Sequence, residues 1–237
     1  MEGNQFKLEL IKTLSFHSEN INSMILLDDT RFASCSGDKK INVYSLSSFT
    51  LISTMKGHKR SVYDICKISN TEIISCSSEQ TIKIWDTLTY KCGATIDNAH
   101  DDWINKLNGT IISCSDCVSI INQVSCAYSN SILSMGNDTL IVGGDRKIMR
   151  IDVKLANVEI VVDDESMGNV FALLKLNDDT VLCGSDNGKI FLYDNIHKSI
   201  CNEEQCHNDL ISSLLISKSH FIISGSGDKT IKVFNVL

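Results

Sequence analysis

Hydrophobic and polar residues alternate in short stretches along most of the chain. The clearest set begins with Ser61–Ile68, continues through Glu72–Cys76 and Thr81–Trp85, and ends in a weaker fourth stretch at Thr95–Ile96. Alternation with a period of two over such lengths predicts β-strands with one buried face. Nowhere does the 3.6-residue period of an amphipathic helix persist over about ten residues. The sequence therefore predicts an all-β chain.

One short tract, rich in Ser, Gly and Cys, recurs six times. Its copies are Ser34–Asp38, Ser75–Glu79, Ser113–Cys117, Val142–Arg146, Cys183–Asn187 and Ser224–Asp228. Their first residues lie 41, 38, 29, 41 and 41 positions apart. A period near 40, with four short strands in each unit, is typical of the blades of a β-propeller. We therefore expect one propeller domain over residues 1–237, with six blades at about 15–54, 55–95, 96–127, 128–160, 161–203 and 204–237.

The last repeat ends after three strands, which leaves its blade one strand short. Residues 6–14 alternate and precede the first repeat, so we expect residues 1–14 to complete the last blade. Closing the ring in this way leaves no open sheet edge where the two ends of the chain meet. The 29-residue spacing between the third and fourth tracts predicts a very short or missing outer strand within residues 118–131.

The second repeat carries a recognisable motif. Gly57-His58, followed by the segment from Ile74 to Asp86 that ends in Trp85-Asp86, resembles a WD-repeat. The same frame fits His17 with Ser34 and Asp38, and His207 with Ser224 and Asp228. The resemblance covers essentially the whole chain and implies a WD40-repeat β-propeller.

In WD-repeats a His, a Ser, an acidic turn residue and a Trp form a hydrogen-bonded set that ties the strands together. The resemblance implies that His58, Ser75, Glu79 and Trp85 form this set here, with Glu in place of the usual Asp. The two other copies have Tyr44 and Phe234 in place of the Trp. Because Phe cannot donate a hydrogen bond, we expect a shorter network in the last repeat.

The WD-repeat resemblance also indicates a binding surface. Residues beside the His, at the start of each first strand, face the narrow end of the ring in this family, and partners often bind there. The positions that take this role here are Asn20, Lys59, Asp101, Trp103, Met167, Asn169 and Leu210. Trp103 is the most informative, because an aromatic residue on a polar rim is a typical hot spot. The alternative is that Trp103 packs into the neighbouring blade.

The net charge of −7 is unevenly distributed. Residues 1–92 carry 11 basic and 10 acidic residues, whereas residues 93–237 carry 11 and 19. This acidic half argues against non-specific nucleic-acid binding by the whole chain. A basic edge over the first two blades is still expected from Lys39, Lys40, Lys59 and Arg60, with a solvated charged rim as the alternative. Such an edge is similar to that of the ribosome-bound receptors for activated C kinase, and implies docking on small-subunit rRNA phosphates.

No pattern in the sequence points to catalysis. His17, His58, His100 and His207 repeat around the ring, and Cys114-x-x-Cys117 lacks the second pair of ligands that a zinc site needs. We therefore expect a protein-interaction scaffold that works within a larger complex. We expect no enzyme activity, cofactor, metal, small-molecule substrate or obligate homo-oligomer.

The ten cysteines show no disulfide-scaffold spacing, and four of them adjoin one strand position, which predicts small, buried, reduced residues. No apolar run is long enough to span a membrane and no secretory signal is visible. These features predict an intracellular protein, cytoplasmic or nuclear.

Overall fold

The computed structural model describes residues 7–97, 106–108, 112–114, 120–121, 124–125, 129–136, 139–152, 154–155 and 157–236. Within these ranges every regular element is a β-strand, apart from a three-residue 3₁₀ helix, η1 (Glu165–Met167). No helix in this described part could cross a membrane. The predicted all-β class is confirmed.

Five antiparallel sheets of four strands make up most of the structure. The first contains β2 (Ile21–Leu26), β3 (Arg31–Ser36), β4 (Lys40–Ser45) and β5 (Leu51–Lys56). The second contains β6 (Val62–Lys67), β7 (Glu72–Ser77), β8 (Ile82–Asp86) and β9 (Cys92–Ile96). The third contains β14 (Ser129–Gly136), β15 (Thr139–Gly144), β16 (Lys147–Asp152) and β17 (Asn157–Asp163). The fourth contains β18 (Val170–Lys175), β19 (Thr180–Ser185), β20 (Lys189–Asp194) and β21 (Ser199–Gln205). The fifth contains β22 (Ile211–Ile216), β23 (Ile222–Ser226), β24 (Ile231–Val236) and β1 (Leu8–Leu14).

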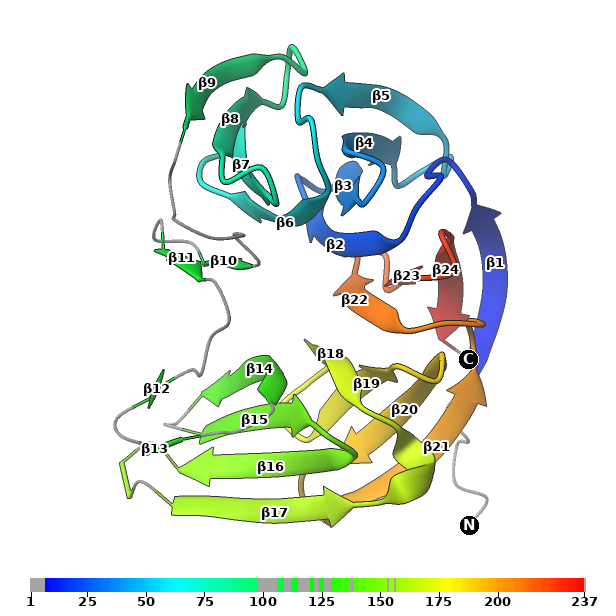
Figure 1. The fold of residues 1–237 in the computed structure, drawn as a ribbon. Coiled ribbons are helices and arrows are strands. Elements are labelled where there is room, and N and C mark those ends of the chain that lie inside the picture. The colour runs from blue at the N-terminus through cyan, green and yellow to red at the C-terminus, as the bar shows by residue number, and fades with distance from the viewer. Residues whose placement is uncertain are drawn as a thin grey trace.

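The sheets are arranged as sectors of a ring (Figure 1), with the first strand of each innermost. Inner strands of neighbouring sheets contact one another in the order β6, β2, β22, β18 and β14. Two short strand pairs lie between the second and third sheets in sequence: β10 (Lys106–Asn108) with β11 (Ile112–Cys114), and β12 (Ile120–Ile121) with β13 (Val124–Ser125). The predicted third blade, 96–127, falls largely outside the described residues, so the count of six blades and their boundaries stay a prediction.

The N-terminal strand closes the ring as the sequence predicts. β1 pairs antiparallel with β24, with Leu8 opposite Val236 and Leu14 opposite Ile231, and Figure 1 shows the two strands side by side. Leu8 and Leu14 are buried, which anchors both ends of the strand in the core. The Leu8 backbone N–H also donates to Glu204 Oε1 at 2.9 Å, so that β1 is tied to the fourth sheet as well.

The core lies between adjacent sheets. Phe32 and Tyr44 of the first sheet pack with Ile223 and Val233 of the fifth, and equivalent clusters fill the other described junctions. A small residue is needed in each second strand where the next inner strand approaches. A Cβ on Gly225 would lie 2.7 Å from Ile21 Cγ2, closer than real Cβ contacts allow.

Cysteines occupy the same second-strand position in the first two sheets. Cys35 and Cys76 stand where the fifth sheet has Gly225, and both are fully buried, as is the neighbouring position Cys183 in the fourth sheet. None of the seven cysteines whose side chains are described is in a disulfide bond. Their burial as small apolar residues agrees with the sequence prediction. The side chain of Cys114 lies outside the described residues.

The strands expected between residues 61 and 96 are confirmed. They appear as β6 to β9, each within one or two residues of the predicted range except the last. β9 spans Cys92–Ile96 and is longer than the Thr95–Ile96 stretch that alternation indicates. Its five residues are all exposed, so no buried face requires apolar and polar residues to alternate before Thr95.

Candidate functional site

One end of the ring is formed by the loops that lead into the inner strands and by the turns between second and third strands. In four sheets a backbone N–H of the turn donates to a carbonyl of the loop. These bonds are Gly37 to Asn20 (3.1 Å), Ser78 to Ser61 (3.1 Å), Asp186 to Asn169 (2.9 Å) and Gly227 to Leu210 (2.9 Å). Their equivalence places all four loops at the same end of the ring. We call this end the turn face.

The second sheet holds a hydrogen-bonded set of four side chains beneath this face. Trp85 Nε1–H donates to Ser75 Oγ at 2.8 Å, and Ser75 Oγ lies 2.6 Å from His58 Nε2. The second nitrogen of the imidazole, His58 Nδ1, lies 2.6 Å from Glu79 Oε1. Glu79 Oε2 also accepts the Lys59 backbone N–H at 2.9 Å, which ties the loop to the turn.

The charges in this set follow from its burial. Burial lowers the pKa of His58, more than the hydrogen bond with Glu79 raises it, so the imidazole is neutral at neutral pH. Burial alone would raise the pKa of Glu79, but hydrogen bonds from His58, Lys59 and Thr81 outweigh it and hold the pKa below its usual range. An ionised carboxylate only accepts, so Nδ1 of His58 carries the proton and Nε2 accepts from the Ser75 hydroxyl.

The first and fifth sheets build the same set with Asp. His17 Nδ1 lies 2.9 Å from Asp38 Oδ2 and its Nε2 lies 2.8 Å from Ser34 Oγ. In the fifth sheet the set consists of His207, 2.8 Å from Asp228 Oδ2 and 2.7 Å from Ser224 Oγ. The third-strand residue differs: the Tyr44 hydroxyl lies 3.2 Å from Ser34 Oγ, whereas Phe234 offers no polar atom. Glu79 thus performs in the second sheet the role that Asp performs in the other two.

The fourth sheet lacks this set. At the position of the loop His it has η1, whose N-terminus is capped by Asp164, with Ser166 N–H donating to Asp164 Oδ1 at 2.8 Å. Met167 turns inward at the end of η1 and packs with Cys183 and Tyr193. Met167 is only 2% exposed, so its assignment to the protein-binding surface is wrong. Its apolar side chain is part of the core between the third and fourth sheets.

The other predicted binding residues are spread around the turn face. Asn20 and Lys59 are exposed in the loops of the first two sheets, and Asn169 and Leu210 are half-buried in those of the fourth and fifth. Asp101 and Trp103 lie outside the described residues. The structure therefore brings Asn20 and Lys59 to neighbouring loops and distributes Asn169 and Leu210 further around the ring.

A polar depression of about 600 Å³ lies on the turn face between the first two sheets. Its lining residues are Ser18, Glu19, Asn20, Asn22, Gly37, Asp38, Lys39, Ser61 and Tyr63. Part of this lining is fixed, because Asn22 Nδ2 donates to the Val62 carbonyl at 2.7 Å. The depression offers a partner mainly amide, hydroxyl and backbone groups.

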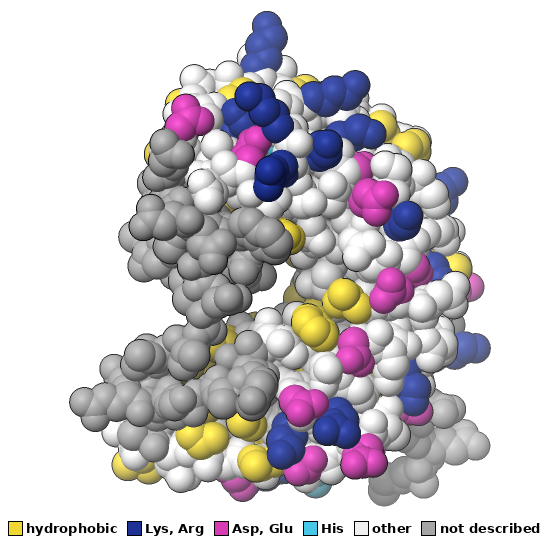
Figure 2. Space-filling view, in the orientation of Figure 1, with side chains coloured by type: hydrophobic (Ala, Val, Ile, Leu, Met, Phe, Trp, Pro, Cys, Tyr) yellow, Lys and Arg dark blue, Asp and Glu magenta, His cyan; other side chains and the backbone are white. Residues whose placement is uncertain are grey.

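Of the four residues of the predicted basic edge, Lys39 lines this depression, and the others are close in sequence to its lining residues Lys39 and Ser61. Lys39, Lys59 and Arg60 are exposed, and Lys40 is 37% exposed at its side chain. Sequence reasoning missed a fifth member, Lys56. Its register places it directly opposite Lys40 across β4 and β5. Figure 2 shows Lys and Arg side chains gathered over these strands and β8, whereas both signs of charge mix over the third and fourth sheets.

No group of His, Cys, Asp or Glu within the described ranges is arranged to hold a metal ion. Among these residues, Thr87 Oγ1, Tyr193 OH and Asn195 Oδ1 are buried without a hydrogen-bond partner. None of these three residues lines the depression on the turn face.

Comparisons with known proteins agree with this architecture. The family model described as "WD domain, G-beta repeat" matches residues 8–45, 49–86 and 199–235, and these ranges contain all three His sets. A solved structure, described as the crystal structure of the WD40 β-propeller domain of Doa1, is similar over 97% of both chains. Its TM-score is 0.56 at 14% sequence identity, a likeness of fold alone. No curated protein sequence matches the chain. The chain belongs to the WD40-repeat β-propeller family.

Proposed function

We propose that the protein is a non-enzymatic interaction scaffold that presents the turn face of its ring to protein partners. The observation that carries the proposal is the rigid construction of this face. Four equivalent backbone hydrogen bonds and three buried His–acid pairs hold its loops and turns in place. A face whose backbone is fixed loses little conformational entropy on binding, which favours recognition by its exposed side chains.

The contact residues in this proposal are Asn20, Lys59, Asn169 and Leu210, with Asp101 and Trp103 from the part of the chain that the structure does not describe. Trp103 remains the proposed hot spot, because buried aromatic anchors contribute about 2 kcal/mol or more to many interfaces. The scaffold works inside a larger complex in the cytoplasm or nucleus, and the lack of disulfide bonds among the described cysteines suits a reducing compartment.

Site-specific photocrosslinking tests the proposal. A photoreactive amino acid is placed at Asn20 or Leu210 on the turn face, and at Asn70 in a turn between first and second strands, at the opposite end of the ring. In cells that express the protein, we expect discrete protein adducts from the first two positions and none from Asn70. Adducts from Asn70 alone would move the binding surface to the opposite end.

A second candidate function is docking on the small ribosomal subunit. It is favoured by the exposed Lys39, Lys59 and Arg60, which suit rRNA phosphates. Docking of this kind would release counterions and weaken steeply as salt rises. Co-sedimentation with ribosomal subunits at 50 mM and 300 mM salt tests it: loss of the protein from the subunit fraction at high salt is expected, and its absence from that fraction at low salt would contradict it.

A further inference from the structure

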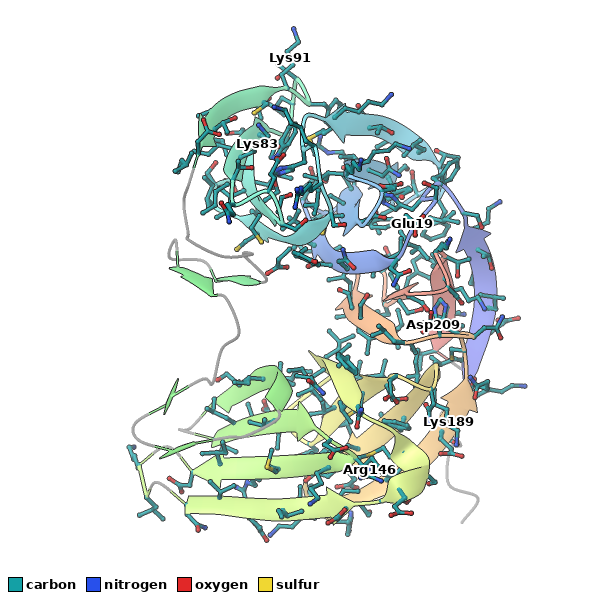
Figure 3. All side chains as sticks on the ribbon, viewed as in Figure 1. Glu19, Lys83, Lys91, Arg146, Lys189 and Asp209 are labelled. Carbon is teal, nitrogen blue, oxygen red and sulfur yellow. The ribbon has the colours of Figure 1, made fainter. Side chains whose placement is uncertain are left out.

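Basic side chains from the first two sheets gather near the polar depression, which Lys39 lines. Lys39 lies in the turn after β3, Lys40 begins β4, Lys56 ends β5, and Lys59 and Arg60 follow in the next loop. Lys83 joins them from β8 (Figure 3), where its Cδ passes 3.9 Å from the ideal Cβ position at Gly57. We call Lys39, Lys40, Lys56, Lys59, Arg60 and Lys83 the cationic cluster.

The strand register places two of these charges against each other. Lys40 and Lys56 are directly opposite on β4 and β5. Like charges in this arrangement are destabilising in an antiparallel pair. The nearest relief within the chain is weak, because Lys40 Nζ lies 3.8 Å from Asp38 Oδ2. An anionic group bound between Lys40 and Lys56 would remove the repulsion.

The nearby acids are already engaged. The side chains of Asp38 and Glu79 are 2% and 12% exposed, and both are held by buried histidines. Burial alone would raise the pKa of Asp38. Its hydrogen bonds, of which the one with His17 has the largest effect, hold the pKa below the usual range. Neither carboxylate is free to turn towards the exposed cations. In the described part of the chain, no acidic side chain lies within ion-pair distance of Lys39, Lys59 or Arg60.

Four lysines of the third and fourth sheets are paired with acids instead. The pairs are Lys147 with Asp163 (3.4 Å), Lys175 with Asp178 (2.7 Å), Lys189 with Glu203 (3.0 Å) and Lys198 with Glu159 (2.6 Å). Among the described residues, cations without an ion pair are therefore most concentrated in the first two sheets. This concentration stands out further because the chain as a whole has a net charge of −7.

We propose that the cationic cluster binds an extended acidic segment, rich in Asp and Glu, of a protein partner. The inference rests on the proposed scaffold function and names the chemistry of its partner. The cluster is small, and residues 93–237 carry 19 acidic against 11 basic residues, so the rest of the chain would repel a long polyanion such as RNA. A short acidic peptide that contacts the cluster alone avoids this repulsion.

The adjoining depression fits the same partner. Asn20, Asn22 and Ser61 offer uncharged polar groups there, while Glu19 disfavours an anion inside it. Within the described residues, Glu19 is paired only with Lys229, whose Nζ lies 3.8 Å away. The acidic residues of the segment therefore lie on the cationic cluster, and its uncharged polar residues enter the depression.

Fluorescence anisotropy with the full chain tests this inference. The probe is a labelled ten-residue peptide of alternating Glu and Ser, in 50 mM NaCl. The variant K56Q/K59Q/R60Q removes three charges of the cluster, and K147Q/K189Q/K198Q removes three charges from the paired set as a matched control. Exposed ion pairs each change a dissociation constant by about 1.4- to 5-fold. We expect the first variant to bind about 3- to 100-fold more weakly than the wild type, and the control to bind within about twofold.

Equal binding by the two variants, or no binding of the peptide by the wild type, would overturn the inference. A labelled ten-nucleotide RNA serves as the second probe, and tighter binding of the RNA than of the peptide would overturn the choice of a protein partner. Photocrosslinks from Asn20 distinguish failure of the acidic-segment proposal from failure of the proposed scaffold function. If they persist unchanged in K56Q/K59Q/R60Q, the scaffold stands and the acidic segment is refuted.

Discussion

Replacing Trp85 tests how much the hydrogen-bonded set and its packing contribute to the fold. Trp85 is 1% exposed and packs with Val43, Ile65 and Ile73 between the first two sheets. Trp85→Ala leaves a cavity at this junction and removes the hydrogen bond to Ser75. Large aromatic truncations in cores cost about 3–5 kcal/mol, and we expect a loss of this size in the free energy of unfolding.

Trp85→Phe is the matched control, because it keeps an aromatic ring and removes only the donor and part of the volume. The fifth sheet already carries Phe234 at the equivalent position, opposite Ile222 as Trp85 is opposite Ile73. A neutral hydrogen bond contributes about 1 kcal/mol, so we expect a cost of about 1–2 kcal/mol for this variant.

Urea unfolding followed by circular dichroism measures both values. For a chain of this size, 1 kcal/mol corresponds to about 2–4 °C in Tm. Trp85→Ala should therefore melt about 6–20 °C below the wild type, and Trp85→Phe only a few degrees below it. The reasoning is refuted if Trp85→Ala unfolds within 1 kcal/mol of the wild type, or if the two variants are equally destabilised.

Three further predictions follow from burial and strand pairing. Burial lowers the pKa of His58 and His207 in the folded state, so their contribution to stability is complete above the unfolded pKa of about 6.5 and is lost as the pH falls. Urea unfolding should show lower stability at pH 5 than at pH 7.5; equal stability would contradict this. Deleting residues 1–14 should expose the edge of β24 and cause aggregation in size-exclusion chromatography, and a soluble, equally stable monomer would disprove closure by β1. Burial raises the pKa of the Cys183 thiol, so it should react with Ellman's reagent only after unfolding, whereas the exposed Cys201 should react at once; equal rates would show the burial to be wrong.

The sequence predicts the strands and the His sets because both repeat with a fixed phase. In each complete set the His precedes the Ser by 17 residues and the acid follows the His by 21, so one recognisable repeat locates the other two. Closure by residues 6–14 is predictable for a similar reason. The alternating stretch has no partner strand in the first repeat, and the last blade has an open edge, so the two are expected to pair.

The prediction fails where the spacing of the repeat is kept but the His is replaced. Ser166 stands 17 residues before Cys183, at the position of the loop His, so counting alone places Met167 on the surface. Without an imidazole to fill the space, the 3₁₀ turn lets the apolar Met167 enter the core. Lys56 is missed for a different reason. Its place opposite Lys40 depends on the register of β4 and β5, which is not visible in the order of residues.

Hydrogen–deuterium exchange of the full chain, with and without the Glu-Ser peptide, tests most directly the claim that the turn face beside the first two sheets is the binding surface. The account predicts slower exchange on peptide binding in residues 36–41 and 56–62, and no change in the opposite turns at 68–71 and 177–180. Protection confined to those opposite turns, with residues 36–41 and 56–62 unchanged, would contradict it.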